Sequence, residues 1–339
     1  MTQRRLGFLL AASLAVLLLA VWVVNHQSGA GTSYAGKAVL PGLENALNSV
    51  TEVRITGAGG VHTTIDKGAR HWMVRERGYP ADLGKLRKLL IDLGELKIVE
   101  RKTRLAQNYP ILGVQNVASP KASGARVDVI TPHKTWSLIV GDSSNGNSCY
   151  VRVADHRQSL LASPLVMVAA KPARWVEPVI VDLGQKRIRG IVEQPAKGWR
   201  FSISRAKASQ ANFTVQGIPP GRKLDSAGAA DAMASALSNL TLEDLRKAAS
   251  PPKDALLSHA VFDTFDGLEV DITGYKAGKG GKHYIEVIAH GSGRKAALRA
   301  ARINARVRGW EYQIRGYRYQ HIFQPLSGLL APLPHSKKR

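Results

Sequence analysis

The sequence is short of cysteine, of aromatic side chains and of acidic residues. Cys149 is the only cysteine, so the chain can form neither an intramolecular disulfide nor a zinc site built on several thiolates. A chain of 339 residues can bury a core large enough to fold without disulfides. We therefore expect Cys149 to be a small buried side chain on a strand, next to Tyr150.

The shortage of acid leaves the chain strongly basic. Its 25 acidic residues face 48 lysines and arginines, which gives a formal net charge of +23. Such an excess attracts anionic partners, which include lipid headgroups, nucleic acid, acidic polymers and acidic protein faces. The charge alone does not choose among these partners.

An uncharged run of nineteen residues, Leu6–Val24, lies near the start of the chain. As an α-helix it would be roughly 28 Å long, which matches the hydrocarbon core of a bilayer. Arg4 and Arg5 precede it and residues 25–28 carry no Lys or Arg, so the N-terminus is predicted to be cytoplasmic and the main body periplasmic. Trp22 lies near the far end, where interfacial aromatic residues are enriched. We predict a bacterial inner-membrane protein with one transmembrane helix, anchored by this segment from Leu6 to Val24.

The same run has an alternative interpretation as a cleaved signal peptide. Signal peptides carry an apolar region of about 7–15 residues that ends in a small-residue cleavage site. The run here is longer, and Ser28-Gly29-Ala30 is a weak cleavage site. We therefore expect the anchor to be retained. In either case the body crosses the membrane.

The rest of the chain is predicted to form two related lobes. The predicted parts are a cytoplasmic stub (1–5), the transmembrane helix (6–24), a tether (25–50), periplasmic lobe 1 (51–170), periplasmic lobe 2 (171–334) and a basic tail (335–339). Each lobe begins with a strand and a returning strand that starts with a tryptophan, Trp72 or Trp199. A proline-containing turn, a helix and three strands follow in each.

The repeat is clearest in Tyr150–Val153 and Tyr284–Val287, which look like the same strand written twice. Because the strands alternate apolar and polar residues, one face of each sheet should be buried under helices. The predicted fold class is therefore α+β, with two related lobes of antiparallel sheet and packed helices after the transmembrane helix.

The spacing of apolar residues predicts several individual elements. Leucines at three- and four-residue steps over Leu83–Leu96 predict a helix, with Asp82 as its N-cap. A second helix is expected near Ser226–Leu240, and Leu160–Ala170 is interpreted as an apolar segment compatible with a helix. Trp310–Ile314 is predicted to be a strand.

No pattern in the sequence specifies catalytic, cofactor or metal chemistry. Gly57–Gly60 and Gly278–Gly281 lack the spacing of dinucleotide and phosphate-binding loops and are interpreted as turns between strands. The ten histidines include no HExxH motif, no two carboxylates pair at a recognisable spacing, and no GxSxG element occurs. We therefore predict that the chain is not an enzyme and uses no cofactor or metal.

The segment from Arg294 to Arg318 is the most basic part of the chain. Its cations are Arg294, Lys295, Arg299, Arg302, Arg306, Arg308, Arg315 and Arg318, against the single acid Glu311. If residues 294–306 form a helix, Arg299, Arg302 and Arg306 share one of its faces.

We name four arginines as candidates for binding a partner or an anionic surface: Arg299, Arg302, Arg306 and Arg308. The alternative is an ordinary solvated face. Aromatic residues just beyond the predicted helix, from Trp310 to Tyr319, could also suit single-stranded nucleic acid. No recognised nucleic-acid motif accompanies them, and a periplasmic location argues against that partner.

Dispersed features across residues 50–325 resemble a known family. They are the N-terminal anchor, Trp72, Tyr79-Pro80-Ala81-Asp82 with the leucine-rich helix, Tyr109, Leu112-Gly113-Val114, Gly141, Tyr150-Val151-Arg152, Arg174-Trp175 and Val179–Ile191. The pattern is similar to that of the periplasmic domain-of-unknown-function family numbered 4340, whose members are membrane-anchored bacterial proteins. The family resembles auxiliary components of ABC transporters of the gliding-motility type. It has no agreed catalytic residues, so the resemblance implies a role and no site.

The expected function is that of a non-enzymatic, membrane-anchored periplasmic scaffold or accessory subunit of an ABC-type transporter complex. Its expected partners are an ABC-type permease or another periplasmic subunit, together with the membrane and its anionic lipids. An envelope-binding module that recognises an anionic lipid or glycan through a basic surface is the alternative.

Overall fold

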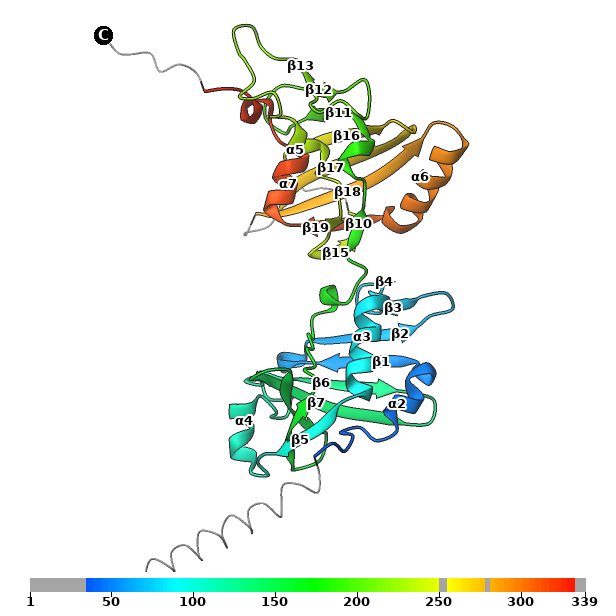
Figure 1. Ribbon diagram of the computed structural model, residues 1–339, viewed down its shortest axis with the longest axis vertical. Helices are drawn as coiled ribbons and strands as arrows, with labels where there is room; N and C mark the ends of the chain where they lie inside the picture. The colour runs from blue at the N-terminus through cyan, green and yellow to red at the C-terminus, as the bar shows by residue number, and fades with distance from the viewer. Residues whose placement is uncertain (1–34, 250–254, 278–280, 333–339) are drawn as a thin grey trace, which may run out of the picture. The chain divides into compact units, whose positions relative to one another are not determined.

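The computed structural model describes residues 35–249, 255–277 and 281–332 (Figure 1). The anchor predicted at Leu6–Val24, with Trp22, lies outside these residues. Among the described residues, no helix combines the length and the apolar content that a membrane crossing requires. The chain divides between Glu177 and Pro178 into two compact units, here called unit 1 and unit 2. Each is a mixed α+β unit built on an antiparallel sheet, as the sequence predicts for the body.

Unit 1 is built on one nine-stranded sheet. Its strands are β1 (Glu52–Thr56), β2 (His62–Lys67), β3 (Trp72–Val74), β4 (Tyr79–Pro80), β5 (Lys97–Arg101), β6 (Ala125–Ile130), β7 (Thr135–Ser144), β8 (Ser148–Val153) and β9 (Ser159–Ser163). Their order across the sheet is β4-β3-β2-β1-β6-β7-β8-β9-β5. The Gly57–Gly60 segment is the turn that joins β1 to β2, as predicted.

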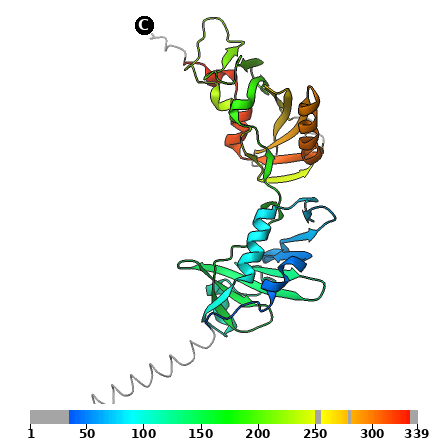
Figure 2. The ribbon, with the colours of Figure 1, turned by 45° about the vertical axis from the view of Figure 1, so that its right-hand side comes forward.

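In the described part of unit 1, the α-helices beside this sheet are α2 (Leu43–Ala46), α3 (Leu83–Gly94) and α4 (Tyr109–Leu112). The helix α3 begins where predicted, because the Asp82 carboxylate accepts a hydrogen bond from the Lys85 backbone N–H at 3.0 Å. Its leucine stripe is buried, and Figure 2 shows the helix lying against the sheet. Leu43 of α2 is also fully buried, so the described part of the predicted tether packs into unit 1.

Unit 2 is built on an eight-stranded sheet and a separate pair of short strands. The sheet contains β11 (Ile188–Gln194), β12 (Phe201–Ser204), β13 (Thr214–Gln216), β15 (Asp244–Lys247), β16 (Ser258–Thr264), β17 (Leu268–Ala277), β18 (Lys282–Gly291) and β19 (Trp310–Ile314). Their order is β13-β12-β11-β16-β17-β18-β19-β15. The pair is formed by β10 (Val179–Val181) and β14 (Leu240–Thr241).

The α-helices of unit 2 are α5 (Asp231–Ala234), α6 (Arg294–Val307) and α7 (Gly316–Ile322). The helix α6 runs beside β18 (Figure 1). A Cβ built on Gly291 would lie 2.3 Å from the Ala296 carbonyl carbon, so only glycine allows this approach. The Asn304 side chain donates to the Ala289 carbonyl and accepts from the Ala289 N–H. It thereby satisfies the backbone groups of β18 at a point where β19 no longer pairs with that strand.

The two sheets share one strand order. The strands β11, β12, β13 and β15–β19 occupy the places of β1, β2, β3 and β5–β9. The segments Tyr150–Val153 and Tyr284–Val287 lie in β8 and β18, which hold the same place. If Val153 of β8 is taken as the equivalent of Val287 of β18, the paired residues on the neighbouring strands also correspond between the two sheets. A row here means residues that are cross-strand partners on successive strands. The central row of unit 1 is Ile55, Val127, Leu138 and Val153, and that of unit 2 is Glu193, Ala260, Ile272 and Val287.

Two helix predictions are wrong. Ser226–Leu240 contains only the single turn α5, because Leu240 leaves the helical path to pair with Val181 in β14. Leu160–Ala170 begins as strand β9 and continues without regular structure, because its first residues pair with β8 and β5.

The tryptophans do not mark equivalent strands either. The returning strand β2 begins at His62, and Trp72 starts the next strand, β3. Trp199 precedes β12, the counterpart of β2, and the residue is 78% exposed.

Candidate functional site

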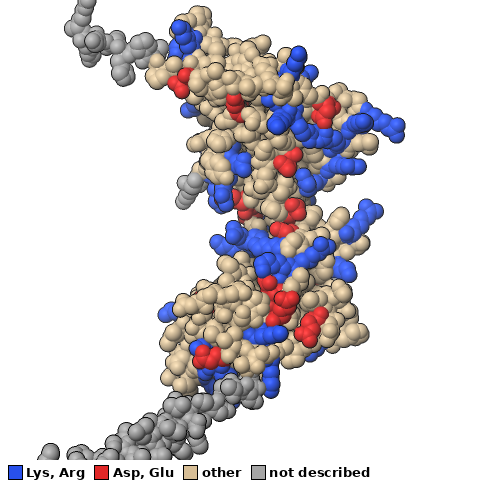
Figure 3. Space-filling view, in the orientation of Figure 1, with Lys and Arg blue, Asp and Glu red and all other residues tan. Residues whose placement is uncertain are grey.

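The helix α6 carries most of the predicted binding arginines. It spans Arg294–Val307, close to the predicted range, and rests on the sheet through Ala296, Ala300 and Val307. This contact face is narrow because its residues are small. Lys and Arg side chains gather over this part of unit 2 in Figure 3.

Two of the four predicted arginines are engaged within unit 2. Arg299 forms an ion pair with Asp266, which also accepts from Arg187 at 3.1 Å. The Thr264 hydroxyl and the charges of these two arginines lower the pKa of Asp266. The Arg306 guanidinium donates to the Ile180 carbonyl at 2.7 Å. These two side chains fasten α6 to its own unit.

The other two predicted arginines, Arg302 and Arg308, are exposed. Neither makes an ion pair with any residue that the structure describes, and the same holds for the exposed Arg294 and Lys295 at the start of α6. These four side chains are called the α6 cations below. The structure thus separates the predicted set into two fastening arginines and two solvent-facing ones, and adds two cations at the helix start.

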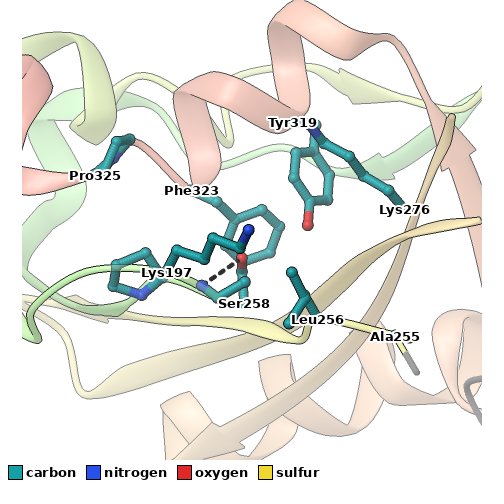
Figure 4. Close-up of a pocket in the computed structure, with 10 residues that line it drawn as sticks. Lys197, Ala255, Leu256, Ser258, Lys276, Tyr319, Phe323 and Pro325 are labelled. Atoms are coloured by element: carbon teal, nitrogen blue, oxygen red, sulfur yellow. Dashed lines mark hydrogen bonds between the residues drawn. The ribbon is translucent and has the colours of Figure 1, made fainter. Parts of the chain in front are cut away.

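A cavity of about 470 Å³ lies at one end of the unit 2 sheet, beside α7 (Figure 4). Its wall is formed by Tyr319 and Phe323, with Leu256 opposite and Ser258 between them. Two lysines, Lys197 and Lys276, are the charged residues of its lining, and none of the described lining residues is acidic. This space is called the α7 cavity below.

The aromatic wall depends on a glycine in the sheet. The Tyr319 ring lies 4.6 Å from the Phe323 ring and 4.7 Å from the His283 ring, measured between centroids. A Cβ on Gly274 would lie 2.3 Å from Phe323 Cε2 and 2.8 Å from Tyr319 Cε2. The rings therefore rest directly on the backbone of β17, where any larger residue would displace them.

A carboxyl group is buried in the core near this wall. The Glu193 side chain on β11 is fully buried, and neither of its carboxyl oxygens has a hydrogen-bond partner among the described residues. Desolvation raises its pKa to about 9, so the group is neutral at pH 7. Burial also raises the pKa of the Tyr319 hydroxyl, with a further contribution from the charge that Glu193 would carry when ionised. Unpartnered buried carboxyls are rare in cores and are often found at functional sites.

The single acid of the basic segment, Glu311, has a structural partner. Its carboxylate is fully buried and accepts from Arg246 Nε at 2.6 Å and from the Tyr275 hydroxyl at 2.9 Å. The Arg246 guanidinium also lies 4.2 Å from the centre of the Tyr284 ring. This network joins β15, β17, β18 and β19 and leaves no free carboxylate at Glu311.

Cys149 is a fully buried strand residue, as predicted. The Val166 backbone N–H lies 3.5 Å from its sulfur, and burial raises the pKa of the thiol. A raised pKa disfavours the thiolate that nucleophilic chemistry needs. Within the described residues, no group of three or more His, Cys, Asp or Glu side chains is arranged to hold a metal ion.

One comparison with known proteins gives a relative. A family model described as a domain of unknown function (DUF4340) matches residues 72–259, which run from β3 in unit 1 to β16 in unit 2. No curated protein and no solved structure matches the chain. The matched span is more than half of the chain and agrees with the resemblance seen in its dispersed motifs. The chain therefore belongs to the DUF4340 family.

Proposed function

We propose that the chain is a non-enzymatic accessory subunit that is tethered to the bacterial inner membrane and docks in the periplasm on an acidic face of a partner protein. The partner is an ABC-type permease or another periplasmic subunit of the same transporter complex. Residues 6–24 supply the tether, and the α6 cations supply the contact. The observation that carries the proposal is this set of exposed cations, which lack an ion pair with any described residue.

The placement of the α6 cations does not serve the helix itself. Arg294 and Lys295 lie in the first turn, where the partial positive charge of the helix N-terminus repels them at a cost of about 0.5 kcal/mol each. No side chain caps this end, and the helix contains no acidic residue. An acidic surface that approaches the helix would offset this repulsion. The electrostatic free energy that is unfavourable in the isolated subunit would therefore favour docking.

The helix is also held firmly enough to present its charges. Asn304 is bonded to the edge of β18, and Arg299 and Arg306 are bonded to side-chain and backbone oxygens of unit 2. A contact surface on a rigid element loses less conformational entropy on binding than one on a loop. The helix therefore suits a scaffolding role.

The test reverses the charge of the two predicted arginines that make no fastening contact. The double variant Arg302→Glu and Arg308→Glu is expected to recover at least about tenfold less partner when the full chain is purified in mild detergent. The matched control is Arg87→Glu with Arg104→Glu, which changes net charge equally at exposed arginines of unit 1. Equal partner recovery by the two double variants would refute the role of α6.

The alternative function, an envelope module for an anionic lipid or glycan, rests on the same cations. It is favoured if the α6 variant keeps its protein partners but no longer sediments with vesicles or glycans that carry negative charge. The proposed tether is tested separately. A retained anchor keeps the protein in the membrane pellet after alkaline extraction, whereas a mature N-terminus after Ala30 would show cleavage.

A further inference from the structure

We propose that the α7 cavity of unit 2 is a binding site for a single-chain anionic amphiphile, that is, an alkyl chain ending in a carboxylate or a phosphate. The site is distinct from the α6 cations and would give the accessory subunit a small-molecule ligand. It lies between the ends of β16 and β17 on one side and α7 on the other.

The interior of the α7 cavity suits an alkyl chain. Its volume of about 470 Å³ falls within the range of small-molecule sites, roughly 300–1,000 Å³. Tyr319 and Phe323 give it a fixed wall, because both rings rest on Gly274 and cannot move toward the sheet. Leu256 lines the cavity although the residue is 55% exposed, which leaves apolar surface for a ligand to cover.

The charge of the α7 cavity selects an anion. Lys197 and Lys276 are exposed and make no ion pair with any described residue. Of the residues that the structure describes in the lining, none is acidic, and the nearby Glu193 is neutral at pH 7 because of its burial. Ser258 and Tyr319 add hydroxyl groups to the lining. Two lysines in the lining of a partly apolar cavity match a ligand whose head carries negative charge and whose tail does not.

Unit 1 provides an internal comparison at the same place in its sheet. The row next to the central one is Ala125, Val140 and Val151 in unit 1, and Ser258, Gly274 and Ile285 in unit 2. A cavity of about 450 Å³ also borders Ala125 and Val140 of unit 1, beside the segment that follows β9. The α7 cavity likewise borders the segment that follows β19, so both sheets leave space at the same position.

The two cavities differ in the side chains that would bind an anion. In unit 1 the lining contains two cations, Lys85 and the exposed Arg174. The ammonium of Lys85 is engaged, because it donates to the Arg174 carbonyl at 2.6 Å and lies over the Trp175 ring. Asp142 adds a carboxylate to the same lining. In unit 2 neither lysine makes an ion pair with a described residue, and the described part of the lining has no carboxylate. The shared fold thus provides the space in both units. Unit 2 differs by its aromatic wall and by lining cations that have no described carboxylate beside them.

The experiment measures binding of decanoate to the full chain in nanodiscs of zwitterionic phosphatidylcholine, with empty nanodiscs subtracted. We expect saturable binding at one site per chain. Decanol, which has the same chain without the charge, and acetate, which has the charge without the chain, should each bind at least about tenfold more weakly. A second arm uses nanodiscs that also contain lysophosphatidylglycerol, a single-chain anionic lipid, and asks whether this lipid remains bound to the chain after delipidation, because this distinguishes a membrane lipid from a free monomer as the source of the ligand.

The variant Lys197→Gln with Lys276→Gln is expected to weaken decanoate binding by about tenfold or more. The matched control, Arg302→Gln with Arg308→Gln, removes the same charge from α6 and should bind decanoate normally. These two variants separate the ligand site from the docking surface. Decanoate binding tests the ligand site and partner recovery tests the docking surface, so either proposal can fail without the other. Absence of saturable binding, equal binding of decanol, or equal loss in both variants would overturn the site.

Discussion

Glu193 is expected to make unit 2 less stable as the pH rises, and replacing it should remove that dependence. The folded chain keeps the carboxyl proton up to a pKa of about 9, whereas the unfolded chain loses it near 4.5. Between these values the folded state holds more protons than the unfolded state. The free energy of unfolding therefore falls as the pH rises through this window, and it is independent of Glu193 below about 4.5 and above about 9.

The magnitude follows from the same two pKa values. Each pH unit within the window changes the free energy of unfolding by about 1.4 kcal/mol. From pH 4.5 to pH 7 the loss is 2.5 such units, or about 3 kcal/mol, as an upper limit for a group that cannot relax toward water. Glu193→Gln keeps the shape and cannot ionise. Glu193→Ile installs the residue type that occupies the same row position in unit 1, Ile55.

Urea unfolding of the full chain at several pH values between 5 and 8 tests this reasoning. We expect the stability difference between either variant and the wild type to increase steadily with pH, by up to about 4 kcal/mol over this range. The control Asp225→Asn removes an exposed carboxylate of unit 2 and should follow the wild type. If the Gln variant and the wild type give parallel curves, the carboxyl is either hydrated or paired in solution, and the neutral buried state is refuted.

Three further substitutions test separate contacts. Gly274→Ala should destabilise unit 2 by about 1–3 kcal/mol, measured by urea unfolding, because the new Cβ would meet the Phe323 and Tyr319 rings; an unchanged midpoint would show that α7 is not seated on β17. Asp82→Ala should cost about 1 kcal/mol by removing the N-cap of α3, while Asp82→Asn should cost little, and a larger loss for Asn would contradict a capping role. Arg246→Met should destabilise unit 2 by about 2 kcal/mol, because it leaves the buried Glu311 carboxylate without its cation, and the double variant with Glu311→Gln should recover part of the loss in a double-mutant cycle.

The central strands could be predicted from the sequence because their side chains alternate between a buried and an open face. The same is true of α3, whose leucine period and N-cap agree. The strands β5 and β15 could not be found in this way. They form one edge of each sheet and read Lys-Ile-Val-Glu-Arg and Asp-Leu-Arg-Lys, because an edge strand keeps charges that prevent further pairing.

For the residues between Ser226 and Leu240, the sequence predicts an element that the structure does not contain. Their apolar spacing fits a helix, but the Leu183 N–H binds the Leu237 carbonyl and Leu240 pairs with Val181. Contacts with a distant strand therefore override the local preference.

The candidate sites were predictable only in part. A basic helix at residues 294–306 follows from the sequence, but which of its arginines stay exposed depends on Asp266 and Ile180, which are distant in the chain. The α7 cavity has no linear signal, because Lys197, Ser258 and Tyr319 come from three separate segments. An acidic residue at the end of a strand, as at Glu193, normally indicates solvent, and only the strand register places it in the core.

The comparison of the two sheets indicates where unit 2 departs from what its fold requires. Unit 1 completes the same strand order with Ile55, Ala125 and Val140 at positions where unit 2 has Glu193, Ser258 and Gly274. A buried carboxyl without a partner and a glycine within a strand each reduce stability, the glycine by about 0.5–1 kcal/mol. The shared strand order does not need these residues, since the other unit forms it without them. They lie in adjacent rows of one buried face, and two of them border the wall or the lining of the α7 cavity. The cost of Gly274, on which the aromatic wall rests, is therefore better explained by the cavity than by the sheet that contains it.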